Sequence, residues 1–405
     1  MANHSTREQF STPTQTEKMK AINLRKILDD LLQSLSEKES DIIKRRFGLD
    51  RLNKETLEEV GKAHGLTRER IRQIENSIIN QKLKQLNESK KDLASLRTMV
   101  IKLLEEHGGL MEKEYLFKIL NKVCDSRIGK NEECLHLKKN HFDFLFSRIF
   151  SEELEEIKRS LRFKRGYKLR SHDLDHMEEV AEELLKEVRQ MKRILRIEEL
   201  LDMVAKLPSY SKHQDKFSQD HYLRLDSLLA DEFFNSEELK IAANYKPLYS
   251  FFQAIRDIEP NKFGYWGPRE SSEISPRTIN DKIYLILKHE GKPMHFNELA
   301  QRINQIGFDH KKANSATIHN ELILDDKYVL IGRGMYGLKE WGLKKGTVAE
   351  VIKDILSSED KPLSREEIID RVLEVRVVKR STINLALSNR QDFQKTKDNK
   401  YILKQ

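Results

Sequence analysis

Two helical patterns separated by a single glycine constrain this 405-residue chain more than any other feature of its sequence. Thr56–Glu59 is a capping box, in which the Thr hydroxyl accepts from the backbone and the Glu side chain reaches back, so a short helix is predicted to start there. Gly65 then supplies a turn that a β-carbon would obstruct. Thr67 caps a second helix, whose inward-facing residues are Ile71, Ile74 and Ile78. A short helix, a glycine turn and a second helix form the helix-turn-helix plan.

Two further helices are predicted before this pair. A first helix places apolar residues at helical spacing, and these are Ile27, Leu28, Leu31, Leu32 and Leu35. Ser36–Glu39 is a second capping box, and the helix that it begins runs through Ile42, Ile43 and Phe47 to a stop at Gly48. The segment before them, residues 1–20, is rich in Ser, Thr and Gln, and we expect a disordered leader.

Polar and basic side chains occupy the outer face of the second helix of this pair, the one that Thr67 caps. They are Arg68, Glu69, Arg72 and Gln73, in its first two turns. In the major groove of DNA, Arg pairs with guanine, Gln with adenine, and Glu accepts from cytosine. The pattern alone also fits an ordinary three-helix unit whose outer face is simply solvated.

Residues 28–86 resemble region 4 of primary sigma factors. The motifs that carry the resemblance are Leu35–Glu39, Arg45–Leu49, Thr56–Gly61 and Gly65–Glu75, in a nearly gapless match. The resemblance implies a domain that reads the −35 promoter element in double-stranded DNA and grips the β flap of core RNA polymerase. Nothing in the chain resembles regions 2 and 3, so we do not expect it to start transcription alone.

The same resemblance assigns roles to individual residues. It implies base contacts by Arg68, Glu69, Arg72 and Gln73, and phosphate contacts by Arg46, Thr56 and Leu57; the start of the second helix, at Thr67, also offers free N–H groups to phosphate. Contacts with RNA polymerase are implied for Leu31, Leu35 and Ile43. Lys82 departs from the family, which usually has Leu there, and we expect different packing at the far end of the helix.

Composition adds limits to this hypothesis. The net charge is +8, with an excess of +4 in residues 1–94 and +6 in residues 274–405, against −2 between them. A basic excess permits a polyanionic partner without requiring one. Two cysteines and the lack of an apolar leader or a stretch long enough to span a membrane predict a cytoplasmic protein without a membrane partner.

The rest of the chain repeats a pattern of three helices followed by a hairpin. Residues 276–341 resemble the HARE helix-turn-helix module, the winged-helix fold of the polymerase delta subunit, through Lys292–Ala300 and Gly334–Leu338. We predict a mainly α chain of serial helix-turn-helix and winged-helix domains with short β-hairpin wings. Its predicted elements include helices over 222–233 and 380–387 and a strand over 262–266. After the leader, the predicted domains are 21–94, 95–172, 173–272, 273–342 and 343–405.

Several motifs favour structural roles. The string Gly332-x-Gly334-x-x-Gly337 lies between two strands rather than opening a helix, which favours a wing turn over dinucleotide binding. Cys124, Cys134, His136 and His141 do not have a common zinc spacing, and we predict no metal site. No catalytic constellation is present, so neither an enzyme nor a cofactor or small-molecule substrate is expected.

Three hypotheses remain from the sequence. The first is a sequence-specific DNA-binding transcription regulator that resembles a partial sigma factor and contacts RNA polymerase. The second is a polymerase-binding protein that uses region 4 as a protein clamp and competes with sigma factors. The third, from the HARE resemblance alone, is a DNA-binding subunit of a restriction or defence system.

Overall fold

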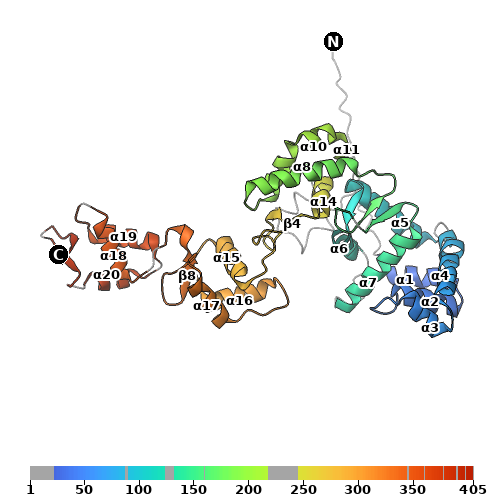
Figure 1. Ribbon diagram of the computed structural model, residues 1–405, viewed down its shortest axis with the longest axis horizontal. Helices are drawn as coiled ribbons and strands as arrows, with labels where there is room; N and C mark the ends of the chain where they lie inside the picture. Colours follow the sequence, from blue (N-terminus) through green and yellow to red (C-terminus); the bar gives the residue numbers. More distant parts are fainter. Residues whose placement is uncertain are drawn as a thin grey trace, which may run out of the picture. The chain divides into compact units, whose positions relative to one another are not determined.

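The computed structural model describes residues 22–86, 90–123, 132–158, 160–217, 245–343, 346–359, 361–376, 378–388, 391–396 and 398–404. These residues form mainly helices, with short antiparallel β-strands between them, as the sequence predicts (Figure 1). They divide into two compact units: one holds the described residues up to 184 and those from 201 to 256, and the other holds 185–200 and those from 257 onward. The five predicted domain boundaries do not follow this division and stay predictions. The predicted leader lies outside the described residues.

The N-terminal domain consists of four helices and two short turns of other helix types. They are α1 (Leu24–Leu32), α2 (Glu37–Phe47), α3 (Leu57–His64), α4 (Arg68–Ser77), the π-helical η1 (Ile78–Leu83) and the 3₁₀ turn η2 (Lys84–Leu86). Both predicted capping boxes are confirmed, and Thr67 accepts from the backbone of Arg70 at the start of α4. Gly48 and Gly65 end α2 and α3 in left-handed conformations, at φ of 63° and 65°. Ile42, Val60 and Ile71 form the core of the helix-turn-helix.

The next part of the chain wraps three helices around a small antiparallel sheet. Its elements are α5 (Lys91–Glu106), β1 (Leu110–Glu112), α6 (Lys113–Val123), α7 (Glu132–Phe144), the π-helical η3 (Leu145–Ile149), β2 (Leu154–Ile157) and β3 (Gly166–Leu169). The strand order is β1-β3-β2. Phe117, Phe142, Phe146 and Tyr167 fill the core with ring contacts.

The segment that follows is more helical than the sequence predicts. It contains α8 (Asp175–Met191), α9 (Ile197–Ala205), α10 (Pro208–Lys212), α11 (Gln214–Phe217), α14 (Lys246–Ala254), β4 (Ile258–Pro260) and β5 (Trp266–Pro268). The sequence did not indicate α14, which packs on β1 and donates from the Ser250 hydroxyl to the Leu110 carbonyl at 2.6 Å. The predicted strand at 262–266 is wrong, because Asn261–Tyr265 closes a tight turn and the strand begins at Trp266. The helix predicted at 222–233 lies outside the described residues.

The last 130 residues contain two units of the same plan, three helices followed by a hairpin. The first has α15 (Ile279–Glu290), β6 (Met294–His295), α16 (Phe296–Ile306), α17 (Ser315–Leu324), β7 (Tyr328–Leu330), β8 (Met335–Leu338) and the 3₁₀ turn η4 (Lys339–Trp341). The second has α18 (Val348–Ser357), α19 (Arg365–Val375), α20 (Arg380–Leu387), β9 (Phe393–Lys395) and β10 (Tyr401–Leu403). Each has its own apolar core. The glycine string at 332–337 lies in the β7–β8 hairpin, as predicted.

Candidate nucleic-acid interface

The outer face of α4 is open to solvent. Arg68, Glu69, Arg72 and Gln73 are all exposed, while Ile71 on the opposite face is fully buried against α2 and α3. This division follows from the periodicity of the helix, which places i, i+4 and i+5 on one side. The four side chains predicted to read bases therefore lie together on one accessible helical surface.

Two of these side chains hold each other in a fixed geometry. Arg72 donates from Nε and from a terminal nitrogen to the two carboxylate oxygens of Glu69, at 2.9 and 2.6 Å. The hydrogen bond from Arg72 lowers the pKa of Glu69, so this carboxylate is charged at neutral pH. Two parallel hydrogen bonds of this kind orient the guanidinium of Arg72, although an exposed ion pair adds little stability to the fold.

Gln73 is also held by a neighbour, and the face continues further than the sequence analysis recognised. Arg70 donates to the side-chain oxygen of Gln73 at 3.2 Å. Asn76 is exposed one turn beyond Arg72 on the same face of α4. An Asn side chain can donate to and accept from adenine. Its i+4 spacing from Arg72 was the signal that could have identified it.

The residues predicted to approach phosphates fall into two groups. Thr56 and Thr67 are exposed N-cap residues whose hydroxyls accept from the backbones of Glu59 and Arg70, which leaves earlier N–H groups of each helix free. Leu57 is half-buried against the helix-turn-helix core. Arg46 is engaged within the protein, as it donates from Nε to Glu75 at 2.8 Å and also to the Glu55 carbonyl. It could reach a phosphate only by giving up these partners.

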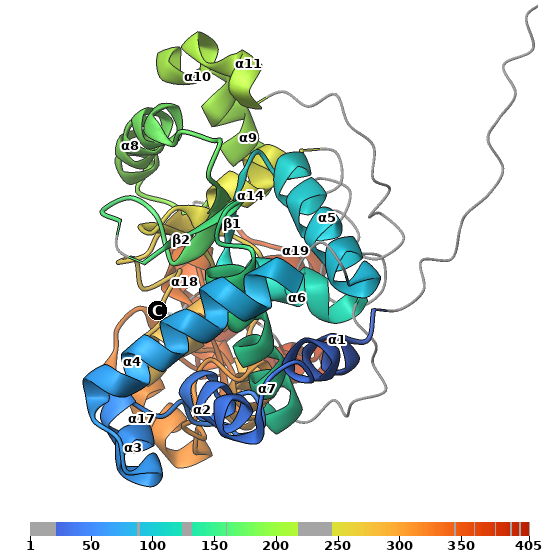
Figure 2. The same cartoon turned by 90° about the vertical axis from the view of Figure 1, so that its right-hand side faces the viewer.

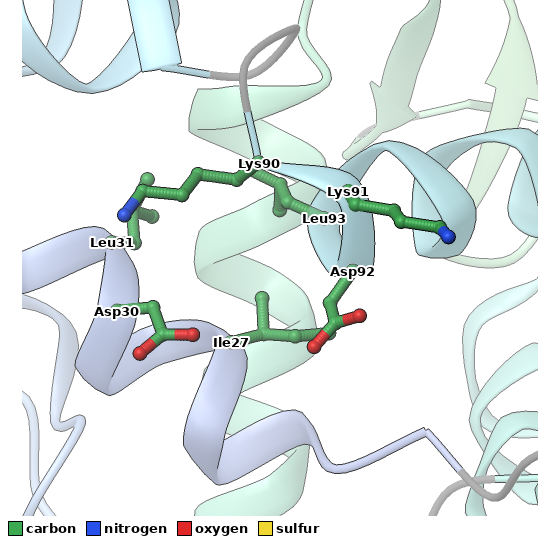
Figure 3. Close-up of a pocket in the computed structure, with 7 residues that line it drawn as sticks. All are labelled: Ile27, Asp30, Leu31, Lys90, Lys91, Asp92 and Leu93. Atoms are coloured by element: carbon green, nitrogen blue, oxygen red, sulfur yellow. The ribbon is translucent and has the colours of Figure 1, made fainter.

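The residues predicted to meet RNA polymerase lie on a covered surface. Leu31 and Ile43 are 1% and 0% exposed, and Leu35 is half-buried. Helices α1 and α2 both contact α7, and Figure 2 shows α7 alongside them. Ile27 and Leu31 of α1 also share a small cavity of about 150 Å³ with Leu93 at the start of α5 (Figure 3).

Two buried polar side chains of α7 fasten this surface to the turn after α2. Asn140 donates from Nδ2 to the carbonyls of Gly48 and Leu52, at 3.1 and 3.2 Å. His141 donates from Nε2 to the Leu49 carbonyl at 2.7 Å, so its neutral ring carries the proton on that nitrogen. Burial lowers the pKa of His141 despite this bond. We call these contacts, with those described next, the α7 interface.

An ion-pair cluster completes the α7 interface. The buried carboxylate of Glu75, on α4, pairs with Arg46 at 2.8 Å and with Arg148 of η3 at 3.5 Å. The Arg148 guanidinium also lies 5.3 Å from the ring centre of Phe47, and that ring packs on Phe144 at 4.8 Å. The inner side of α4 is thus joined to α2 and η3 by ion pairs, while its outer face stays open.

The C-terminal end of α4 continues into a turn that is not a regular α-helix. The helix becomes π-helical at Ile78, and Lys82 in this turn pairs with Glu39 at 2.8 Å. This pair lowers the pKa of Glu39, which also completes the capping box at Ser36. No group of three or more potential ligands that could hold a metal is present in the described ranges. Of the four residues considered for zinc, Cys124 lies outside those ranges, and His141 is hydrogen-bonded to the Leu49 carbonyl.

No helix in the part of the chain described here is long and apolar enough to cross a membrane.

Comparison with known proteins assigns the N-terminal domain. Residues 31–85 match the family model for sigma-70, region 4. The chain is 48% identical over 68 residues to RNA polymerase sigma factor SigA of Bacillus sp, which is 17% of this chain and 18% of that protein. It is 60% identical over 48 residues to RNA polymerase principal sigma factor HrdD of Streptomyces viridifaciens, 12% of this chain and 14% of that protein.

These matches define a class of domain rather than of whole protein. The chain spans less than a fifth of the length of either curated relative. The family match ends at residue 85, so the HARE resemblance and the winged-helix repeats stay predictions. No solved structure matches the chain. Residues 31–85 are thus a sigma-70 region 4 domain, which connects the chain with DNA binding and transcription.

Proposed function

We propose that the chain is a sequence-specific DNA-binding regulator of transcription that reads a −35-like element with the outer face of α4. The observation that carries this proposal is the exposure of Arg68, Glu69, Arg72 and Gln73 on one face of the second helix of a sigma-70 region 4 domain. The open N-termini of α3 and α4, at Thr56 and Thr67, can bind the flanking phosphates through free N–H groups.

Replacing both arginines tests base reading directly. In Arg68→Ala with Arg72→Ala, we expect the preference for a promoter-like duplex over a scrambled one to fall by roughly 5- to 150-fold per contact. Arg25→Ala removes an exposed charge from α1, away from α4, and is the matched control. Binding to both duplexes is measured by fluorescence anisotropy at fixed salt, because phosphate contacts depend strongly on salt. An unchanged preference in the double variant would overturn the assignment.

We further propose that contact with core RNA polymerase is conditional. The sigma-70 region 4 match includes α2 and the end of α1, which supports RNA polymerase as a partner, and we propose its β flap as the contact. In the described structure, however, Leu31 and Ile43 are buried and α7 contacts both helices. These residues would become available to a partner only when the α7 interface opens.

Loosening that interface tests the second proposal. Asn140→Ala removes two hydrogen bonds to the turn after α2, and Arg148→Ala removes an ion pair to α4. We expect the combined variant to bind core polymerase more tightly than the native chain, in the absence of DNA. A variant with the same number of substitutions at exposed sites, Leu135→Ala with Arg25→Ala, controls for nonspecific effects. Equal binding by all three proteins would contradict the conditional contact.

A further inference from the structure

The two C-terminal units share a plan but differ in the charge of matching elements. Residues 315–338 of the first unit run from α17 through the β7–β8 hairpin and hold two basic and three acidic residues. The corresponding 24 residues of the second unit, 380–403, run from α20 through the β9–β10 hairpin and hold five basic and two acidic residues. The net charge is therefore −1 in the first segment and +3 in the second, although both segments have the same order of elements.

The basic groups of the second unit are exposed and few of them form ion pairs, although Lys400 is near enough to Glu367 to help lower its pKa. Lys379 is the N-cap residue of α20, Lys395 ends β9, and Lys400 precedes β10; all three are exposed, and none forms an ion pair with another described residue. Arg380 approaches Asp370 at 3.5 Å, with both side chains about two-thirds exposed. An exposed pair at this distance contributes little and parts easily.

Acidic residues of the same unit are occupied elsewhere. Glu350 and Glu367 accept from the backbones of Thr347 and Ser364 in two capping boxes. Glu359 pairs with Arg371, and Asp392 pairs with Lys353 at 2.6 Å. The third helix and the hairpin therefore keep a positive surface, although the first half of the unit, residues 347–375, holds eight acidic and four basic residues.

We propose that α20 and the β9–β10 hairpin form a second contact with double-stranded DNA, through its phosphates, independent of the contact made by α4. The major groove admits an α-helix or a two-stranded ribbon, and flanking lysines suit the phosphates on its edges. After Arg380, the exposed side chains of α20 that would face the duplex are short or apolar: Ser381, Thr382 and Leu385. With few groups that can read bases, this contact adds affinity without sequence preference. The matching segment of the first unit, residues 315–338, has a net charge of −1, and we do not expect it to take part.

The test uses the full chain and removes three charges. In Lys379→Gln, Lys395→Gln and Lys400→Gln together, we expect roughly 10-fold weaker binding near 100 mM salt, equally for a promoter-like and a scrambled duplex. The slope of log affinity against log salt should fall by about 2 to 3. The matched control replaces three exposed lysines elsewhere, Lys186, Lys206 and Lys292, by Gln. Circular dichroism melting checks that both variants remain folded.

The outcomes separate this inference from the proposed function. If the triple variant binds like its control, the second contact is refuted, whatever the Arg68→Ala, Arg72→Ala variant does. If the triple variant loses affinity while the arginine variant keeps full sequence preference, the second contact stands and reading by α4 fails. A greater loss for single-stranded RNA of equal length than for the duplex would assign the surface to RNA and overturn the proposal.

Discussion

The two faces of the N-terminal domain differ in what covers them. The outer face of α4 carries four polar side chains that are exposed to solvent, while Leu31 of α1 and Ile43 of α2 are buried, and α7 contacts both helices. Both surfaces are predicted to bind a partner of the transcription machinery. One of them is available as the protein stands, and the other is occupied by the protein's own chain.

The comparison teaches that one domain can keep one surface exposed to solvent while another part of the same chain covers a second surface. Because Glu75 on the inner side of α4 pairs with Arg46 and Arg148, this cluster can position the outer face of α4, which we propose to read DNA. In this chain α7 contacts both α1 and α2, and the four predictions below test the packing of that surface and the exposure of α4.

The largest effect is expected from the ring at the centre of the α7 interface. Phe144→Ala removes a fully buried side chain that packs on Phe47, and we expect the free energy of unfolding to fall by about 3–5 kcal/mol. Urea unfolding followed by fluorescence measures the change. Leu135→Ala on the same helix, where the side chain is 39% exposed, should cost far less. Equal costs for the two variants would mean that Phe144 does not hold the interface.

A smaller loss is expected from the shared carboxylate. Glu75→Gln keeps the shape of the side chain and removes the charge that pairs with Arg46 and Arg148. We expect a loss of about 1–3 kcal/mol, because charged hydrogen bonds to a buried group are replaced by weaker ones. Glu58→Gln, at an exposed pair on α3, is the control. A stable Glu75→Gln protein would show that this cluster does not couple α4 to η3.

We expect the free energy of unfolding to fall in acid, because buried histidines must take up protons. Burial lowers the pKa of His141, and it lowers the pKa of His107, the C-cap residue of α5, to about 4, from 6.5. The unfolded chain then binds protons that the folded chain does not, so stability is full above about pH 6.5 and falls as the pH decreases. The slope is at most about 1.4 kcal/mol per pH unit for each histidine.

His141→Gln isolates one contribution to this pH dependence. Glutamine keeps an N–H donor for the Leu49 carbonyl and does not titrate. The difference in unfolding free energy between native chain and variant should shrink between pH 7.5 and pH 5.5. If the two urea curves keep a constant separation over that range, His141 is not the group that titrates.

The smallest effect is expected on the open face. Glu69→Gln breaks an exposed ion pair with Arg72, and we expect the free energy of unfolding to change by less than about 1 kcal/mol. The carboxylate that we propose to accept from cytosine is lost, so the preference for the promoter-like duplex should fall. Competition binding on the two duplexes measures it. A large loss of stability would mean that the outer face of α4 has a structural role.

Local signals in the sequence predicted much of the fold and little of its long-range packing. Capping boxes at Ser36 and Thr56 correctly placed α2 and α3, and the predicted bounds of α20 agree with the structure. In contrast, α14 is buried on nearly every side and therefore has no polar face to reveal its period. Its anchor, Leu110, lies 140 residues away from Ser250.

The candidate site divides in the same way. The exposed face of α4 follows from helical periodicity, so Arg68 and Arg72 could be placed from the sequence. The burial of Leu31 could not, because α1 has the pattern of any amphipathic helix and the pattern does not say what covers it. Asn140 contacts Gly48 across 92 residues, and no local feature of either segment indicates this bond.

Amide hydrogen exchange of the full chain, with and without a promoter-like duplex, tests the central claim most directly. A nine-residue helix such as α1 is marginal in isolation, so slow exchange across Leu24–Leu32 in the free protein would report its docking under α5 and α7. We predict slow exchange there in both states, and new protection on DNA binding in the first turn of α4. Fast exchange of α1 in the free protein, or DNA protection at α1 instead of α4, would contradict the account.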